Sequence, residues 1–242
     1  LGMVLFQKIA ILALLAIDAT SFLGSLFMLW LAGRVFLAPT LAVPTEEKAP
    51  AALRWQMLTI RQKRSLLILP ALAAVGSPAM ALLPAMAQQI HPQDAASLAL
   101  PLLFARSMGQ LCGPLLLKRD SLTRFAARTP RILLCLGIFL AAYGMLPLLS
   151  GWMACALGMI FVAHLASNVL FAAGTFAVLS SFQTTHMASA SSKVWRWQTL
   201  SASLFTGIAA MAAAGFGSIQ ALYSVSSAAL ILVALIMYVY RE

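Results

Sequence analysis

Seven apolar runs, each about as long as a bilayer is thick, constrain the fold of this chain more than any other feature. A helix needs about 20 mostly apolar residues to cross the hydrocarbon core of a membrane. Such runs lie at roughly 9–33, 65–87, 96–117, 132–149, 153–179, 198–216 and 219–240. They lack the strict alternation of barrel strands. The sequence therefore predicts an all-α, polytopic helical membrane protein.

The composition agrees with this class. The chain is 62% apolar and only 9% charged, with a mean hydropathy of +0.94, whereas soluble domains are about half apolar and about a quarter charged. A net charge of +10 would suggest nucleic acid in a soluble protein. Here the charges lie mainly between the apolar runs. The lipid bilayer is thus the expected partner, and nucleic acid is excluded.

Basic residues are unevenly distributed over the connections between the runs. The long connections at 34–64, 118–131 and 180–197 carry most of them, whereas "QQIHPQDA", "SGW" and "FGS" contain neither Lys nor Arg. Cytoplasmic loops of membrane proteins carry an excess of Lys and Arg. The three long connections and the C-terminus are therefore expected in the cytoplasm.

The segment between the first two runs has a character of its own. "APTLAVPTEEKAP" is rich in proline and predicts a linker. Residues 51–67 place apolar and basic side chains at helical spacing, which predicts a short amphipathic helix on the membrane surface. The predicted organisation is a leading transmembrane helix at 1–33, a cytoplasmic linker with this helix at 34–64, and a six-helix block at 65–242.

Arg106 lies near the middle of the run at 96–117. An Arg at that depth costs about 2.5–3.5 kcal/mol on insertion, so we expect it to face the bundle or a watery cavity. Gln110 follows one turn later and extends the same face. Two interpretations stay open: Arg106 binds an anionic substrate or a proton-cycling carboxylate, or it forms a buried structural ion pair.

Two further polar residues share one helical face. His164 and Asn168 are one turn apart in the run at 153–179. A His at this depth could relay protons, because its charge changes near physiological pH. The alternative is a neutral His that is hydrogen-bonded between helices.

Asp18 is the only carboxylate inside an apolar run. An unpaired carboxylate in lipid is unfavourable, so Asp18 either has a structural hydrogen-bond partner or takes part in proton coupling.

Gly109 and Gly113 are spaced for the close approach of two helices.

Enzyme chemistry has little support in the sequence. Cys112, Cys135 and Cys155 all lie inside apolar runs, and their spacing fits neither a metal site nor a disulfide framework. No phosphate-binding "GxxxxGK[ST]" motif occurs. We therefore expect no enzyme activity, no catalytic residues, no metal and no cofactor.

Several segments resemble one transporter family. "AIDATSFLGSLFMLW", "LLILPALAAVGSPAMALLPAMAQQIHPQDA" and "GQLCGPLLLKRD" resemble the sixth, seventh and eighth spans of the major facilitator superfamily, nearest to its enterobactin-exporter-like branch. The resemblance implies that the chain is a C-terminal portion, spans six to twelve. The implied fold is a six-helix bundle plus one leading transmembrane helix.

The resemblance also implies a function. It is secondary active transport: the proton-coupled export of a small amphipathic or anionic molecule, of the siderophore or drug type, across the inner membrane. Arg106, Gln110, His164 and Asn168 would serve substrate binding or coupling, with Asp18 a further coupling candidate on the peripheral sixth span. The partner would be an N-terminal half that is missing from this chain, or another half. The alternative is a non-transporting seven-span membrane subunit or scaffold.

Overall fold

A computed structural model describes residues 11–37, 53–116 and 119–241 of the 242-residue chain. These residues are almost entirely helical and contain no strand. Within them, five helices are long and apolar enough to cross a membrane, and two shorter apolar helices accompany them. The prediction of an all-α helical membrane protein is therefore confirmed.

The chain forms two compact units, Leu1–Ala51 and Ala52–Glu242. The first contains α2 (Ile11–Leu37), an apolar helix that covers most of the predicted leading run. The boundary between the units falls inside the predicted linker.

The second unit begins differently from the prediction at 51–67. Residues Trp55–Met57 form a single 3₁₀ turn, η2, and α3 (Ile60–Ile90) starts directly after it. Thr59 fixes this start, because its hydroxyl accepts a hydrogen bond from the backbone N–H of Gln62 while its own N–H donates to the Gln62 side chain. A separate amphipathic helix is therefore absent from residues 53–59, and the residues that follow belong to α3.

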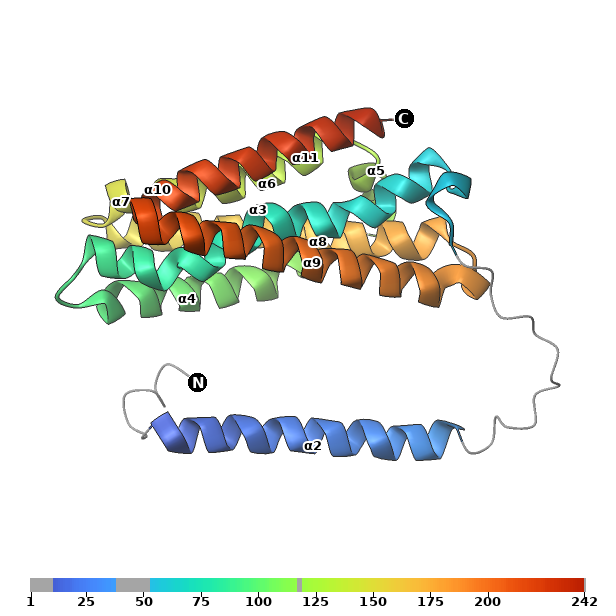
Figure 1. The fold of residues 1–242 in the computed structure, drawn as a ribbon, viewed down its shortest axis with the longest axis horizontal. Helices are drawn as coiled ribbons and strands as arrows, with labels where there is room; N and C mark the ends of the chain where they lie inside the picture. The colour runs from blue at the N-terminus through green and yellow to red at the C-terminus, as the bar shows by residue number, and fades with distance from the viewer. Residues whose placement is uncertain (1–10, 38–52, 117–118, 242) are drawn as a thin grey trace. The chain divides into compact units, whose positions relative to one another are not determined.

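The helices of the second unit lie roughly along one direction (Figure 1). After α3 come α4 (Ala95–Cys112), α6 (Thr129–Gly144), α8 (Met153–Ser181) and α9 (Thr184–Phe216). The last segment runs from α10 (Ser218–Ala221) through a π-helical turn, η4 (Leu222–Ser226), into α11 (Ser227–Val239). Shorter elements connect them: η3 (Gly113–Leu116), α5 (Arg119–Ala126) and α7 (Leu146–Leu149).

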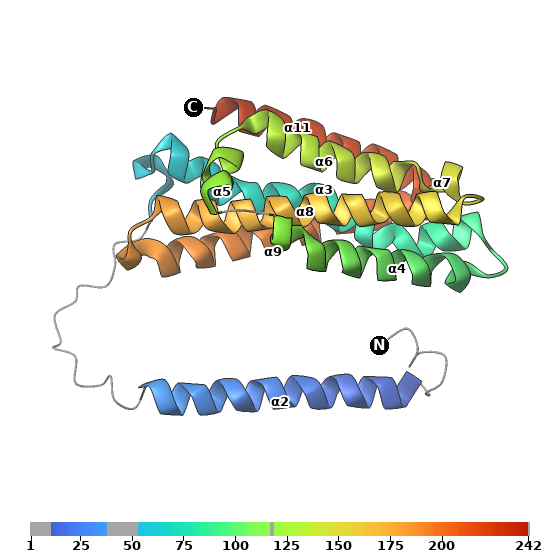
Figure 2. The same ribbon diagram turned by 180° about the vertical axis from the view of Figure 1, so that it is seen from behind.

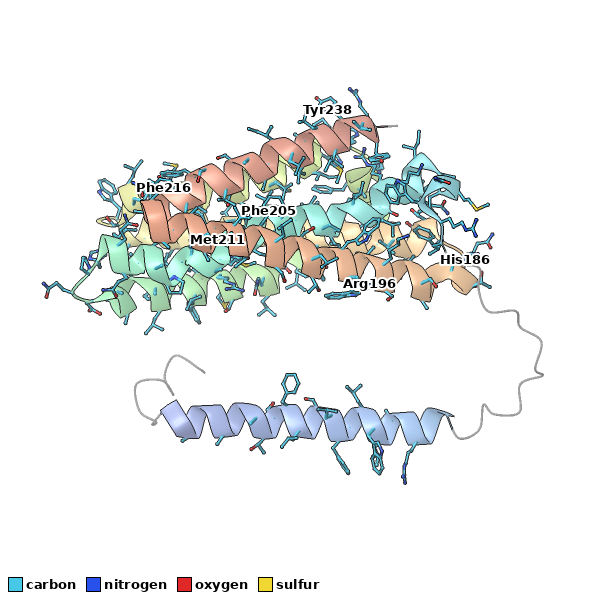
Figure 3. The ribbon with its side chains drawn as sticks, in the orientation of Figure 1. His186, Arg196, Phe205, Met211, Phe216 and Tyr238 are labelled. Atoms are coloured by element: carbon cyan, nitrogen blue, oxygen red, sulfur yellow. The ribbon has the colours of Figure 1, made fainter. Side chains whose placement is uncertain are left out.

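Helix α9 begins much earlier than the predicted span at 198–216. Its 33 residues correspond to about 50 Å at 1.5 Å per residue, whereas the hydrocarbon core is about 30 Å thick. The helix is therefore longer than a membrane crossing needs, and Lys193 lies on the helix instead of in a loop. Figure 3 shows His186 and Arg196 in one half of α9, with Met211 and Phe216 in the other.

The two kinds of connection lie at opposite ends of this unit. The start of α3, α5 and the start of α9 lie at one end, which we call the basic end, while α7 and the turn at 91–94 lie at the other (Figures 1 and 2). At the basic end, the Trp55 ring packs against Trp197 and Tyr240, with centroids 5.2 and 5.8 Å apart. Aromatic clusters with adjacent lysines are typical of a membrane interface.

Candidate functional site

A cavity of about 520 Å³ lies among α3, α4, α6, α8 and α9. Its lining is mixed. The polar side chains are Ser77, Gln110, His164, Ser167, Asn168, Gln198, Thr199 and Ser203, and the larger apolar ones are Leu72, Met80, Phe139, Phe171 and Trp195. Small-molecule sites in proteins typically measure about 300–1,000 Å³ and combine apolar walls with a few placed polar groups. The size and lining suit a small amphipathic ligand.

His164 is the most buried polar residue of this cavity, with 1% of its surface exposed. Its Nε2 lies 2.7 Å from the hydroxyl of Tyr143, so a hydrogen bond joins α8 to α6. The ring of Phe139 packs edge-on against the imidazole, with centroids 5.2 Å apart. A hydrogen bond between helices is what the second interpretation of His164, as a structural residue, predicts.

The second ring nitrogen of His164 has a different environment. Its Nδ1 is buried and has no hydrogen-bond partner among the described residues. A buried polar atom of this kind normally finds a partner. Nδ1 is therefore a buried polar atom whose partner the described residues do not supply.

Asn168 lies one turn after His164 and also lines the cavity. Its side-chain Nδ2 donates to the backbone carbonyl of His164 at 3.1 Å, and the Ser167 hydroxyl donates to the same carbonyl at 3.0 Å. In the described part of the chain, the side-chain carbonyl of Asn168 makes no hydrogen bond and is left as an acceptor.

Two glycines bring α4 against α8 at this point. A Cβ on Gly109 would collide with the carbonyl oxygen of Phe161 and touch the side chain of His164, and a Cβ on Gly113 would come within 2.6 Å of the Asn168 Cβ. The predicted close-approach role of this glycine pair is confirmed. The contact places Gln110 on the same cavity as His164 and Asn168.

Arg106 lies one turn before Gln110 on α4 and is partly exposed. It is not part of the cavity lining. It makes no hydrogen bond or ion pair within the described ranges, so the buried ion pair is not formed there. The structure therefore brings Gln110, His164 and Asn168 to one cavity, and Arg106 does not line it.

The remaining candidate residue is Asp18. It belongs to α2 in the first unit, and its side chain lies outside those that the structure describes. Its role remains a prediction.

Sequence reasoning did not identify Tyr143 or the residues that α9 contributes. Trp195, Gln198, Thr199 and Ser203 line the cavity, and Gln198 Oε1 is buried without a hydrogen-bond partner in the described residues. Their spacing of three to four residues is a helical signal. The signal was obscured because Trp195 falls in the segment at 180–197 that was predicted to be a loop.

No metal site is visible in the described residues. They contain no group of three or more His, Cys, Asp or Glu side chains that could hold an ion. The three cysteines are free, with Cys135 buried, Cys112 partly buried and Cys155 exposed.

Comparisons with known proteins gave no match, either to a family model, to a curated protein or to a solved structure.

Proposed function

We propose that this chain is part of a secondary active transporter that exports a small amphipathic or anionic molecule in exchange for protons. The observation that carries the proposal is the 520 Å³ cavity with Gln110, His164 and Asn168 in its wall. Polar and ionisable groups inside a membrane are unfavourable, and they commonly mark substrate or proton pathways. An ordinary packing core would not need them there.

Each residue has a defined task in this proposal. The positive charge of Arg106, one turn before Gln110 on α4, attracts an anionic substrate. The Gln110 amide donates a hydrogen bond to the anionic group, and the side-chain carbonyl of Asn168 accepts one from a donor group of the substrate. His164 accepts a proton on Nδ1 and later releases it, while its bond to Tyr143 holds the ring in place.

The finer assignment is to a transporter of the major facilitator type in an inner membrane, with the C-terminus in the cytoplasm. It is supported by the resemblance of the quoted segments and by the separation of basic and neutral connections at the two ends (Figure 1). Transporters of this type alternate access between two halves around a site near the midplane. The bundle would therefore work with a second half as its partner.

The test uses the full-length protein in proteoliposomes with an imposed pH gradient and an anionic naphthalene sulfonate dye as the probe. Arg106→Leu should abolish gradient-driven dye flux, and Arg106→Lys should keep part of it because the charge remains. Arg54→Leu is the control. Arg54 is exposed, lies at the basic end, and is distant in sequence from Arg106. Normal flux in a folded Arg106→Leu protein would refute the assigned role.

The same experiment addresses the alternative. A non-transporting subunit or scaffold would give no flux with the unmodified protein under any gradient. It would also be insensitive to every substitution in the cavity wall.

A further inference from the structure

A second cavity lies at the basic end, separate from the candidate site. It has a volume of about 240 Å³ and is formed by α3, α5 and α8. Its described lining includes three arginines, Arg61, Arg64 and Arg124. Helix α5 packs against α8 beside it (Figure 2). Three arginines therefore contribute to the wall of one small cavity.

Arg64 is a fixed part of this cavity. Only 3% of its surface is exposed, although Arg is rarely buried. Its Nε donates to the Ala126 carbonyl at 3.1 Å and its Nη1 donates to the Thr129 hydroxyl at 2.9 Å. These bonds hold one positive charge at the wall before any ligand arrives.

Arg61 and Arg124 differ from Arg64 because both are exposed. Arg61 makes no hydrogen bond or ion pair with the residues that the structure describes. Long arginine side chains at a rim can fold over an anion and donate several hydrogen bonds to its oxygens. Arg64 is thus a fixed wall of the cavity, and Arg61 is an exposed side chain at its rim.

The volume limits the ligand. At about 30 Å³ per water molecule, the cavity holds roughly eight waters, which is room for a phosphate group and its nearest substituents. The hydroxyl-bearing residues Ser65, Ser180 and Ser181 contribute polar atoms to the lining, and Ile68 and Ala177 contribute apolar ones. A phosphate attached to a larger, partly apolar molecule fits this mixture.

The position favours a lipid as the source of that phosphate. The cavity includes Arg61, in the first turn of α3, and the neighbouring Lys63 lies over the ring of Trp55, 5.7 Å from its centroid. Trp clusters of this kind mark the membrane interface, where phospholipid headgroups lie. Basic pockets between transmembrane helices on the cytoplasmic side are suited to anionic lipid headgroups.

We propose that the cavity lined by Arg61, Arg64 and Arg124 binds the phosphate headgroup of an anionic phospholipid. The bound lipid would join α3, α5 and α8 at the basic end. This site is independent of the central cavity and of any transported substrate.

The test measures lipid binding by the purified full chain. Native mass spectrometry follows the retention of phosphatidylglycerol and of phosphatidylcholine at equal concentrations. The unmodified protein should prefer phosphatidylglycerol, and Arg61→Gln with Arg124→Gln should weaken its retention by about fivefold for each arginine removed. Should the double variant not fold, Arg61→Gln alone carries the test, because this exposed side chain has no described partner.

The matched control is Arg54→Gln with Arg128→Gln. Both residues are exposed at the same end and neither lines the cavity in the structure, so the control removes equal charge. We expect its phosphatidylglycerol retention to change by at most about twofold. An equal loss in both double variants would overturn the site, since general electrostatics would then explain the preference.

Two further arms distinguish the source of the phosphate and test competition within the chain. Inorganic phosphate at millimolar concentration should not displace phosphatidylglycerol; if it binds with equal strength, the lipid assignment is overturned in favour of a soluble phosphate.

Asp120→Asn removes a carboxylate four residues before Arg124. Binding that is unchanged or tighter supports a site for an external anion, and a loss of binding contradicts it.

Discussion

The hydroxyl oxygen of Tyr143 and Nε2 of His164 lie 2.7 Å apart, and their hydrogen bond joins α6 to α8 at the central cavity. Tyr143 is fully buried, with its ring stacked on Phe139 at a centroid distance of 4.8 Å. The bond therefore determines which way the imidazole faces. Nδ1, the other ring nitrogen, is buried and has no partner among the described residues.

Replacing Tyr143 with Phe keeps the ring and removes the hydroxyl. Nε2 of His164 would lose its partner in a buried position, so we expect the free energy of unfolding to fall by about 1–2 kcal/mol. The proposed proton-coupled flux should fall as well, because the imidazole is no longer held. Thermal unfolding in detergent and dye flux in proteoliposomes measure the two effects.

Tyr223→Phe is the matched control for that substitution. The Tyr223 hydroxyl donates to the Gly144 carbonyl at 2.6 Å, but Tyr223 is partly exposed and does not line the cavity. Its removal should lower stability slightly and leave flux unchanged. Equal flux in the two variants would show that the Tyr143–His164 bond has only a structural role.

Substitution of Gly113 tests the contact between α4 and α8. In Gly113→Ala the new methyl group meets the Asn168 Cβ at 2.6 Å, so the helices must separate. Overpacking of this kind costs about 1–3 kcal/mol. Gly158→Ala is the control within α8, because nothing lies within 4 Å of its Cβ position, and it should stabilise the helix by up to about 1 kcal/mol. A tolerated Gly113→Ala in unfolding measurements would contradict the described contact.

Gln198→Leu should separate ligand binding from stability. Its Oε1 is buried without a partner in the described residues, so replacing the amide with an apolar group of similar size should be neutral or slightly stabilising. A polar ligand in the cavity would lose a hydrogen bond, which corresponds to roughly a fivefold weaker affinity. Equilibrium binding of the dye, compared with the melting temperature of the same variant, decides between these effects.

Arg64→Leu should destabilise the basic end. Two hydrogen bonds from a buried guanidinium would be lost, at about 1.5–3 kcal/mol for a bond to a charged group. Arg64→Lys should recover only part of this, because an ammonium group cannot reproduce the planar arrangement of donors. Arg54→Leu, at an exposed position, should change stability by no more than about 0.5 kcal/mol. Equal melting temperatures for all three variants would show that the two hydrogen bonds of Arg64 do not stabilise the basic end.

Sequence patterns predicted helix positions well where the bilayer dictates them. The predicted run at 153–179 closely matches α8, because a long apolar stretch has few alternatives in a membrane. The start of α9 was not predictable in this way. Ala190 and Val194 in its early turns pack with Leu66 and Leu69 of α3, and this tertiary contact supports helix in a Ser- and Thr-rich segment that has little apolar periodicity.

In the candidate site, too, some residues could be predicted from the sequence and others depend on tertiary contacts. Gln110, His164 and Asn168 could be predicted because a polar face within one apolar run is visible along the sequence. Tyr143 could not, since a single Tyr in an apolar run is equally typical of an interface anchor. Its significance depends on a partner 21 residues away on another helix, and only the packing of α6 against α8 reveals that pairing.

The orientation of the bundle can be tested at two exposed positions at its opposite ends. His91 follows α3 in the turn before α4, and Arg128 precedes α6 at the basic end. The excess of Lys and Arg predicts that Arg128 faces the cytoplasm. Single cysteines are introduced at these positions after Cys112, Cys135 and Cys155 have been replaced by Ala, and intact cells are treated with a membrane-impermeant maleimide. His91→Cys should react directly and Arg128→Cys only after permeabilisation. The reverse pattern would invert the orientation, and equal labelling would contradict a membrane crossing between the two positions.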